Sequence, residues 1–338
     1  MEYSPDVFRG KVVYCNCDDP FESNFFRYFV LNFNKLGLKQ LITTSYKPSP
    51  VANTQLQLFG DDKTLAKSKG RPKINANKFI INEVRDIDGD GEFNLKDVAK
   101  QLKANKHNEW TPLAGDGDFR SDECVNLLKQ SDIVATNPPF SLFREYIKQL
   151  INYDKKFLII GNMNAITYKE VFPLIKSNKL WLGNKTSSQQ MFLEAPKEYT
   201  ERVMANRPQG MWWRIIDGKP LIGIHTALWF TNLDHGRRHQ PLQLMTEAEV
   251  IKFTTKKPFE KYDNYDAIEV SLVKNIPSDY KGVMGVPVSF LDSHNPDQFE
   301  ILGSNRGVDQ DPNKIYGRGS YLNGKEVYKR LFIKHRKK

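Results

Sequence analysis

The 338-residue sequence has few cysteines and no long apolar run. Its cysteines are Cys15, Cys17 and Cys124, too few for a disulfide-stabilised scaffold. Cys15 and Cys17 alternate along an expected strand with no second pair, so their spacing does not indicate a zinc site. No stretch of 18 apolar residues occurs, so no membrane-spanning helix is predicted. The first five residues lack the basic and apolar regions of a signal peptide. We therefore expect a globular cytoplasmic protein with reduced thiols.

Positive charge is in excess, and much of it lies near the end of the chain. Lys and Arg number 50 against 40 Asp and Glu, which gives a net charge of +10. From Lys314 onward, nine Lys or Arg residues face one acidic residue, Glu326. Such a cluster can contact phosphates, and a solvated basic tail is the alternative. Charge alone does not identify nucleic acid as the partner.

Strands alternate with helices in the first half of the chain. The apolar pattern predicts strands at 11–17, 38–46, 78–85, 132–137 and 156–162, and helices at 22–37, 95–104, 121–130 and 141–153. In the first helix Phe25, Phe29 and Phe33 recur at four-residue spacing, and Gly37 fits a C-cap. Residues 47–78 are rich in Pro, Ser, Asn, Lys and Gly and indicate a long loop. The alternation predicts an α/β fold with a parallel sheet covered on both faces.

The pattern changes in the second half. Residues 210–233 alternate as in an antiparallel hairpin, with Asp217-Gly218 as its turn. Residues 234–300 mix short strands and loops with a helix at 246–253. We predict two domains. The first, 1–233, has a mostly parallel sheet with an antiparallel hairpin, and the second, 234–338, is a smaller mixed region with a basic C-terminal segment.

One predicted strand ends in a stiff corner. Its apolar residues run directly into Asn137-Pro138-Pro139-Phe140. Open parallel sheets bind ligands beyond the carboxyl ends of their strands. Prolines fix φ and donate no N–H, so the Asn137 side-chain oxygen and the Pro138 carbonyl offer two acceptors at one point. Phe140 adds a face for stacking. The corner suits an exocyclic amine on a flat heterocycle, and a turn without chemistry is the alternative.

Several stretches resemble a known family. The tetrapeptide resembles the (Asp/Asn/Ser)-Pro-Pro-(Tyr/Phe) signature of amino-methyltransferases that use S-adenosylmethionine. Residues 10–29, 117–123, 132–146 and 285–303 resemble the EcoRI-type adenine-specific DNA methyltransferases. The resemblance implies a Rossmann-like S-adenosylmethionine-dependent domain at 1–233 and a target-recognition region at 234–338. It further implies a monomer that methylates adenine N6 in double-stranded DNA after turning the base out of the duplex.

The resemblance leaves the biological context and two other functions open. A cognate restriction endonuclease would act on the same site without direct contact, in the cytoplasm where the enzyme meets the nucleoid. Methylation of an RNA base or a protein glutamine is one alternative function. A DNA-binding protein with a decayed cofactor site is the other.

The resemblance also implies roles for individual residues. The catalytic corner is Asn137, Pro138, Pro139 and Phe140. The turn after the first strand would hold the methionine part of the cofactor, and Asp118 and Phe119 would contact its adenine. The predicted cofactor-binding residues are Asp18, Asp19, Pro20, Ser23, Asp118, Phe119 and Asn137. Helix capping and a plain turn are the alternatives for these two segments. The family has an N-terminal segment with an Asp-Glu-Phe-Tyr-Thr-like motif that closes over the cofactor. Met1-Glu2-Tyr3 matches at best the end of that segment.

Three further clusters have both a functional interpretation and an alternative. Arg237, Arg238 and His239 offer donors for guanine edges or phosphates, and the alternative is an ordinary basic hairpin end. Asn162, with Asn164, would face the flipped base or cap a turn. Asp86, Asp88 and Asp90 match calcium-loop positions, but a strand precedes them and the last position is Asp97 instead of Glu. We expect no metal, and an acidic turn that caps the next helix.

Overall fold

The computed structural model describes residues 4–17, 24–46, 76–87, 97, 100, 107–183, 191–224, 226–254, 259–306 and 319–336. The chain forms two compact units, Met1–Ile160 and Gly161–Lys338. The boundary between them falls inside one strand. The predicted division at residue 233 separates cofactor binding from target recognition and stays a prediction. The predicted loop at 47–78 and the helix at 95–104 lie mostly outside the described residues.

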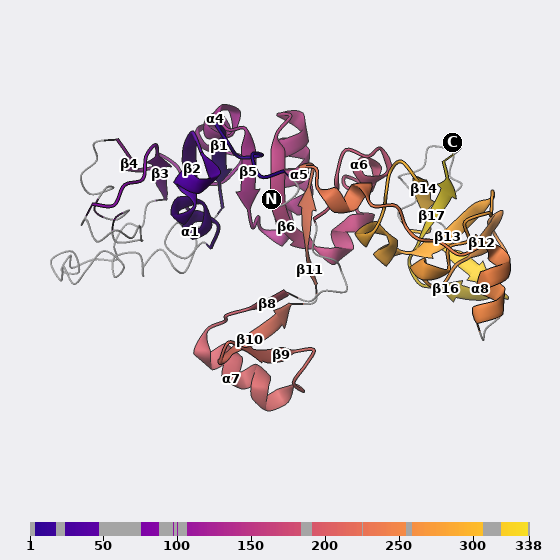
Figure 1. Ribbon diagram of the computed structural model, residues 1–338. Helices are drawn as coiled ribbons and strands as arrows, with labels where there is room; N and C mark the ends of the chain where they lie inside the picture. Colours follow the sequence, from indigo (N-terminus) through magenta and orange to yellow (C-terminus); the bar gives the residue numbers. More distant parts are fainter. Residues whose placement is uncertain are drawn as a thin grey trace. The chain divides into compact units, whose positions relative to one another are not determined.

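The first unit is built on a sheet with the strand order β4-β3-β2-β1-β5-β6 (Figure 1). The strands are β1 (Val12–Cys15), β2 (Gln40–Thr44), β3 (Asn77–Ile81), β4 (Glu109–Pro112), β5 (Ile133–Thr136) and β6 (Lys156–Asn162). Strands β2, β1, β5 and β6 are parallel neighbours, which confirms the predicted mostly parallel sheet. Strands β3 and β4 are antiparallel. The expectation of unbroken strand–helix alternation is therefore wrong at this edge.

The helices of this unit follow the predicted signals closely. They are α1 (Asn24–Leu31), α2 (Phe33–Leu36), α4 (Asp122–Gln130) and α5 (Phe143–Asn152). The predicted helix at 22–37 is divided at Asn32, whose side chain donates to the Tyr28 carbonyl at 2.8 Å and so competes with the helical backbone. Gly37 closes it in the left-handed conformation, as predicted. Ser121 caps α4 by accepting from the Cys124 N–H.

The second unit contains several small sheets (Figure 1). Its strands are β7 (Trp181–Leu182), β8 (Met191–Leu193), β9 (Trp213–Ile216), β10 (Lys219–Ile224), β11 (Ala227–Thr231), β12 (Ala267–Glu269), β13 (Val283–Pro287), β14 (Phe299–Ser304), β15 (Ser320–Leu322), β16 (Lys325–Val327) and β17 (Arg330–His335). Its helices are α6 (Phe172–Lys176), α7 (Lys197–Asn206) and α8 (Glu247–Phe253). One sheet has the order β8-β10-β9 and another β12-β13-β17-β14. Strand β11 pairs with β7.

The predicted hairpin is confirmed, but its place in the fold is not the expected one. Strands β9 and β10 pair around Asp217 and Gly218, which have φ of 51° and 76°, as a two-residue turn requires. The hairpin joins β8 in a separate sheet and does not extend the parallel one. The predicted hairpin range also included β11, which belongs to another strand pair.

The basic C-terminal segment is folded in residues 319–336. Strand β17 lies between β13 and β14, and Leu331, Phe332 and Ile333 on it are fully buried. The alternative of a frayed basic tail is therefore wrong for these residues. In the described part of the chain, no helix combines the length and apolar character that crossing a bilayer requires.

Candidate active site

The carboxyl ends of β1 and β5 lie side by side in the sheet of the first unit. Strand β1 pairs with β2 on one side and β5 on the other, which makes this edge a topological switch point where open sheets bind ligands. Asn16 follows β1 and is 1% exposed. Its carbonyl accepts from the Thr136 hydroxyl, and its side-chain oxygen accepts from the Tyr146 hydroxyl. The ends of β1 and β5 are thus fixed to one another.

The predicted catalytic corner continues from β5 at this edge. Asn137 is exposed, Pro138 is buried, and Phe140 is 39% exposed. The Pro139 carbonyl accepts from the Leu142 N–H at 3.0 Å, which starts the 3₁₀ turn that leads into α5. Among the described residues, no hydrogen bond is found to the Asn137 side chain or the Pro138 carbonyl. Both acceptors can therefore serve a ligand, and the catalytic role stays a prediction.

Gly117 brings a second segment to the same edge. Its φ is 80°, and a Cβ built on it would lie 2.0 Å from the Ser45 carbonyl oxygen. Ser45 directly follows β2, the other neighbour of β1. Only glycine tolerates both this conformation and this approach. The close packing holds residues 116–119 at the carboxyl end of β2.

Asp118 is engaged by a residue that the sequence did not single out. Its carboxylate accepts from the Arg120 backbone N–H at 2.8 Å, from Nε at 2.9 Å and from Nη2 at 2.7 Å. Arg120 also donates to Glu145 at 3.0 Å. The side-chain hydrogen bonds from Arg120 lower the pKa of Asp118, so Asp118 is ionised at neutral pH. A carboxylate accepts about four hydrogen bonds, so this one keeps an acceptor position.

Phe119 is more deeply buried than a residue that stacks on a ligand needs to be. It is 3% exposed, and its ring meets the Tyr146 ring edge-on at 5.0 Å. The Arg120 guanidinium lies 5.4 Å from its centroid. Phe119 is therefore packed against Tyr146 and Arg120 within the protein, and its stacking on the cofactor's adenine stays a prediction.

The described residues fit the adenosine part of S-adenosylmethionine. The glycine at 117 leaves no side chain between the segment and the end of β2, and the ionised Asp118 can accept from an adenine amine. Directly after β1 and Asn16, Cys17 has a φ of 60°, a backbone strain that concentrates at ligand sites. The predicted cofactor residues Asp18, Asp19, Pro20 and Ser23 lie outside the described residues.

The structure places Arg238, a predicted DNA contact, in the interior of the second unit. It is 8% exposed, and its guanidinium lies 3.5 Å from the Trp181 ring centroid. It donates to Asp234 at 2.9 Å and to the Asn178 side chain. This arrangement anchors the loop, because both the charge and the flat face are engaged within the protein. Arg237 is half-buried, and His239 is exposed with its Nε2 2.8 Å from the Asp234 carboxylate, and the DNA contact of these two residues stays a prediction.

The other two clusters show local roles. Asn162 is half-buried and caps the turn Met163–Thr167 by accepting from the Asn164 N–H at 2.8 Å. Its contact with a flipped base stays a prediction. In the acidic turn, Asp97 is fully buried and accepts from the Ile87 N–H at 3.1 Å, while Asp88 and Asp90 lie outside the described residues. Within the described ranges, no group of three His, Cys, Asp or Glu side chains is arranged to hold a metal.

Comparisons with known proteins give a consistent result. The profile of the family described as "Adenine-specific methyltransferase EcoRI" matches residues 1–336. Type II methyltransferase M.EcoRI of Escherichia coli is 42% identical over 100% of this chain and 90% of its own length. Type II methyltransferase M.MpnI of Mycoplasma pneumoniae is 34% identical over 98% and 90%, and M.MgeORF184P of Mycoplasma genitalium is 35% identical over 97% and 89%. No solved structure matches this chain.

Proposed function

The chain belongs to the EcoRI family of adenine-specific methyltransferases, and from this we propose that it transfers a methyl group from S-adenosylmethionine to adenine N6 in double-stranded DNA. The observation that supports the proposal most directly is the exposed Asn137 at a switch point of the sheet. Its side-chain oxygen and the Pro138 carbonyl are acceptors that no described residue occupies. An amine with two N–H bonds is the complement of that pair.

The corner would act by positioning. S-adenosylmethionine supplies an electrophilic methyl group on a sulfonium. The two acceptors would hold the adenine amine so that its lone pair leaves conjugation with the ring and points at the methyl carbon. The N–C bond would form as the S–C bond breaks, S-adenosylhomocysteine would leave with the electron pair on sulfur, and the excess proton on N6 would pass to solvent. Holding the reacting atoms in line contributes up to about 7–11 kcal/mol. Adenine N6 is itself the nucleophile, so the three cysteines take no part, and burial raises the pKa of the Cys124 thiol.

The substrate base has to leave the duplex to reach such a corner. Extrusion costs a few kcal/mol of stacking and pairing. Phe140 is 39% exposed beside Asn137, and a stacked purine would recover part of this cost. On the cofactor side, Asp118 would accept from the adenosine amine and Asn137 would border the methyl donor, and the roles of Asp18, Asp19, Pro20 and Ser23 at its methionine part stay predictions. Arg237 and His239 would contact DNA.

The proposal includes the state and setting of the enzyme. It acts as a monomer in the cytoplasm, and a restriction endonuclease would share its DNA site without binding it. Sedimentation of the protein with one DNA duplex should give a complex with one protein chain. Two chains per duplex would contradict the monomeric part alone.

Transfer of a labelled methyl group tests the reaction itself. Purified protein is incubated with labelled S-adenosylmethionine and, separately, with duplex DNA, RNA and a protein extract. We expect label in DNA only, recovered as N6-methyladenine after digestion. Label in RNA or protein would favour the alternative amine substrates. Binding of DNA without binding of S-adenosylmethionine in calorimetry would indicate a decayed cofactor site and refute the proposal.

The Asn137→Ala variant tests the acceptor role. We expect turnover to fall by roughly 10²–10³-fold, the effect of removing one positioned hydrogen bond at a reacting centre. Cofactor affinity should stay near that of the unchanged protein, because Asp118 and its contacts with Arg120 are untouched. Asn152→Ala is the matched control, since Asn152 is an exposed asparagine at the end of α5 in the same unit. Equal turnover in the two variants would remove Asn137 from the mechanism.

A further inference from the structure

The second unit contains an aromatic side chain that is both strongly exposed and rigidly mounted. We propose that Tyr328 is a DNA-stacking residue, whose ring packs on a base that loses its neighbour when the target adenine turns out of the duplex. The inference rests on the proposed function and adds a residue to it. Tyr328 is 73% exposed and lies in the short connection between β16 and β17.

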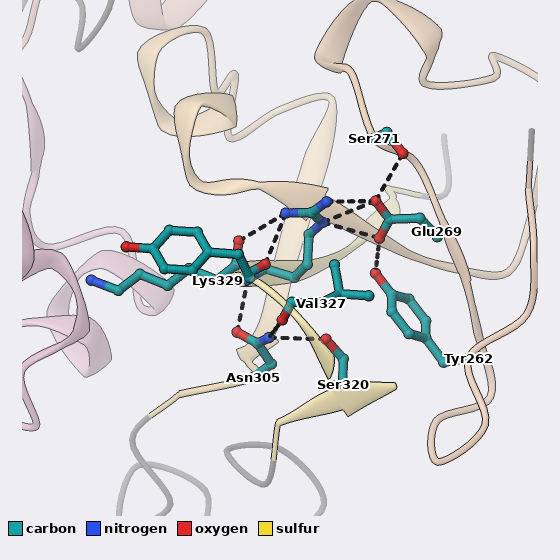
Figure 2. A network of polar contacts seen from close by, with 9 residues as sticks. Tyr262, Glu269, Ser271, Asn305, Ser320, Val327 and Lys329 are labelled. Atoms are coloured by element: carbon teal, nitrogen blue, oxygen red, sulfur yellow. Dashed lines mark hydrogen bonds and ion pairs between the residues drawn. The ribbon is translucent and has the colours of Figure 1, made fainter. Parts of the chain in front are cut away.

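The backbone around Tyr328 is held by a buried ion pair. Arg330 donates through Nη2 to Glu269 at 2.7 Å and through Nε at 3.0 Å, and the two side chains are 14% and 7% exposed. Glu269 also accepts from the Tyr262 and Ser271 hydroxyls. Burial alone would lower the pKa of Arg330, but the hydrogen bonds and charge of Glu269 outweigh it and raise that pKa. Arg330 therefore stays charged, and Figure 2 shows the Tyr262 and Ser271 hydroxyls directed at the Glu269 carboxylate.

Side-chain donors fix three consecutive carbonyl groups in this connection. Arg330 Nη1 donates to the Tyr328 carbonyl at 2.8 Å and to the Lys329 carbonyl at 3.2 Å. The Asn305 side chain donates to the Val327 carbonyl at 3.3 Å and accepts from the Arg330 N–H at 2.7 Å. Figure 2 shows Asn305 beside Val327 and Ser320, to which it also donates, at 2.9 Å.

The next residue joins this connection to the segment after β6. Lys329 Nζ donates to the Asn164 side-chain oxygen at 2.7 Å, and Asn164 N–H donates to Asn162. These two asparagines are the residues that the sequence placed near a flipped base. Tyr328 is therefore linked through its neighbour Lys329 to Asn164 and Asn162, within one unit.

Desolvation and conformational entropy favour a binding role for Tyr328 over that of an ordinary surface tyrosine. Burying an ion pair has a large desolvation cost and is weak as a source of stability, so its effect here is to fix one backbone conformation. An aromatic ring on a fixed backbone loses little conformational entropy when it binds. Lys329 Nζ lies 5.9 Å from the centroid of the Tyr328 ring, Lys325 lies on the preceding strand β16, and this positive charge attracts a phosphate backbone. A flat ring in basic surroundings is the arrangement that stacks on nucleic-acid bases.

The test compares Tyr328→Ala with Tyr328→Phe and with Tyr321→Ala. Tyr321 is a 36% exposed tyrosine on β15 of the same unit, and serves as the matched control. The target sequence is first mapped by methylation-sensitive sequencing of DNA from cells that express the protein. Binding is measured on a duplex with that target, on a duplex without it, and on a target duplex with 2-aminopurine at the methylated position. The fluorescence of 2-aminopurine rises when the base unstacks.

We expect Tyr328→Ala to bind the target duplex about 5- to 150-fold more weakly, the range for one stacked base, with a smaller rise in fluorescence at saturation. Binding to target-free DNA should be unchanged, because no base is exposed there. Tyr328→Phe keeps the ring and should behave like the unchanged protein, as should Tyr321→Ala.

Two results would overturn the inference while leaving the proposed function intact. One is unchanged target binding and fluorescence in Tyr328→Ala. The other is an equal loss on target and target-free DNA, which indicates a general contact or a damaged fold. If the unchanged protein neither binds nor methylates DNA, both the inference and the proposed function fail.

Discussion

Gly117→Ala perturbs the cofactor side of the site at one defined point. The left-handed conformation costs a non-glycine residue about 1–2 kcal/mol. The new Cβ would lie 2.0 Å from the Ser45 carbonyl, whereas real contacts stay above 3.0 Å, so one partner has to retreat by about 1 Å. Ser45 is fixed by two hydrogen bonds to Asn77, both 2.9 Å long. The segment of Asp118 therefore moves, because the end of β2 cannot.

The magnitude follows from that displacement. A shift of about 1 Å in a positioning group costs on the order of 10²-fold, so we expect the dissociation constant for S-adenosylmethionine to rise by about 100-fold. Titration calorimetry measures it directly. Gly115→Ala is the control in the same turn, because its Cβ would meet nothing within 4 Å, and its affinity should be unchanged. DNA binding without cofactor should be equal in both variants.

A Gly117→Ala protein that binds S-adenosylmethionine as tightly as Gly115→Ala would refute this reasoning. It would mean that residues 116–119 do not border the cofactor, or that their spacing from β2 is unimportant. A loss of the fold would be recognised by a lower melting temperature of Gly117→Ala than of Gly115→Ala.

Two further predictions concern the second unit. Arg238→Ala should lower the free energy of unfolding, measured by denaturant titration, by about 2 kcal/mol or more through the lost Trp181 contact. Arg237→Ala should keep that stability and reduce the salt slope of DNA binding by about 1. The reverse pattern would contradict the argument from burial. Burial lowers the pKa of His294 from 6.5 to about 4, so the unfolded state binds the proton more readily than the folded state. The contribution of neutral His294 to stability is therefore fully present above pH 6.5 and is lost as the pH falls toward 4. The free energy of unfolding should fall by about 2 kcal/mol between pH 7 and 5 from this group, and His294→Gln should abolish that part; an equal fall in both proteins would contradict it.

The parallel sheet could be predicted because its strands are continuous apolar runs. Strand β5 reads Ile-Val-Ala-Thr and is wholly buried, and β6 begins and ends at the predicted residues. Strand β4 could not be found this way, because Glu109 and Pro112 at its ends are exposed and an edge strand needs only one partner. Only the pairing of β4 with β3 reveals it.

The accessibility of the corner could be predicted from the sequence, whereas the contacts of the residues around it could not. Asn137 and Phe140 are exposed, as an accessible corner requires. Arg120 was missed because a charged residue beside a Gly-Asp turn has no distinguishing pattern, and its link to Glu145 spans 25 residues. Arg238 was assigned to DNA because sequence shows charge without burial. Its contact with Trp181 joins positions that are far apart in the chain.

The pairing of β1 with β5 governs when the first unit can assemble. The amide of Val12 bonds to Asp132, 120 residues later, and Val13 faces Ile133 in the parallel ladder. Such distant pairing makes loop closure costly and slows the search for the native topology. On the ribosome, β1 can pair with β2 early, but its other side stays apolar and unpaired until the residues of β5 have been synthesised. Helices α1 and α2, which form locally, are its nearest means of shielding during that interval.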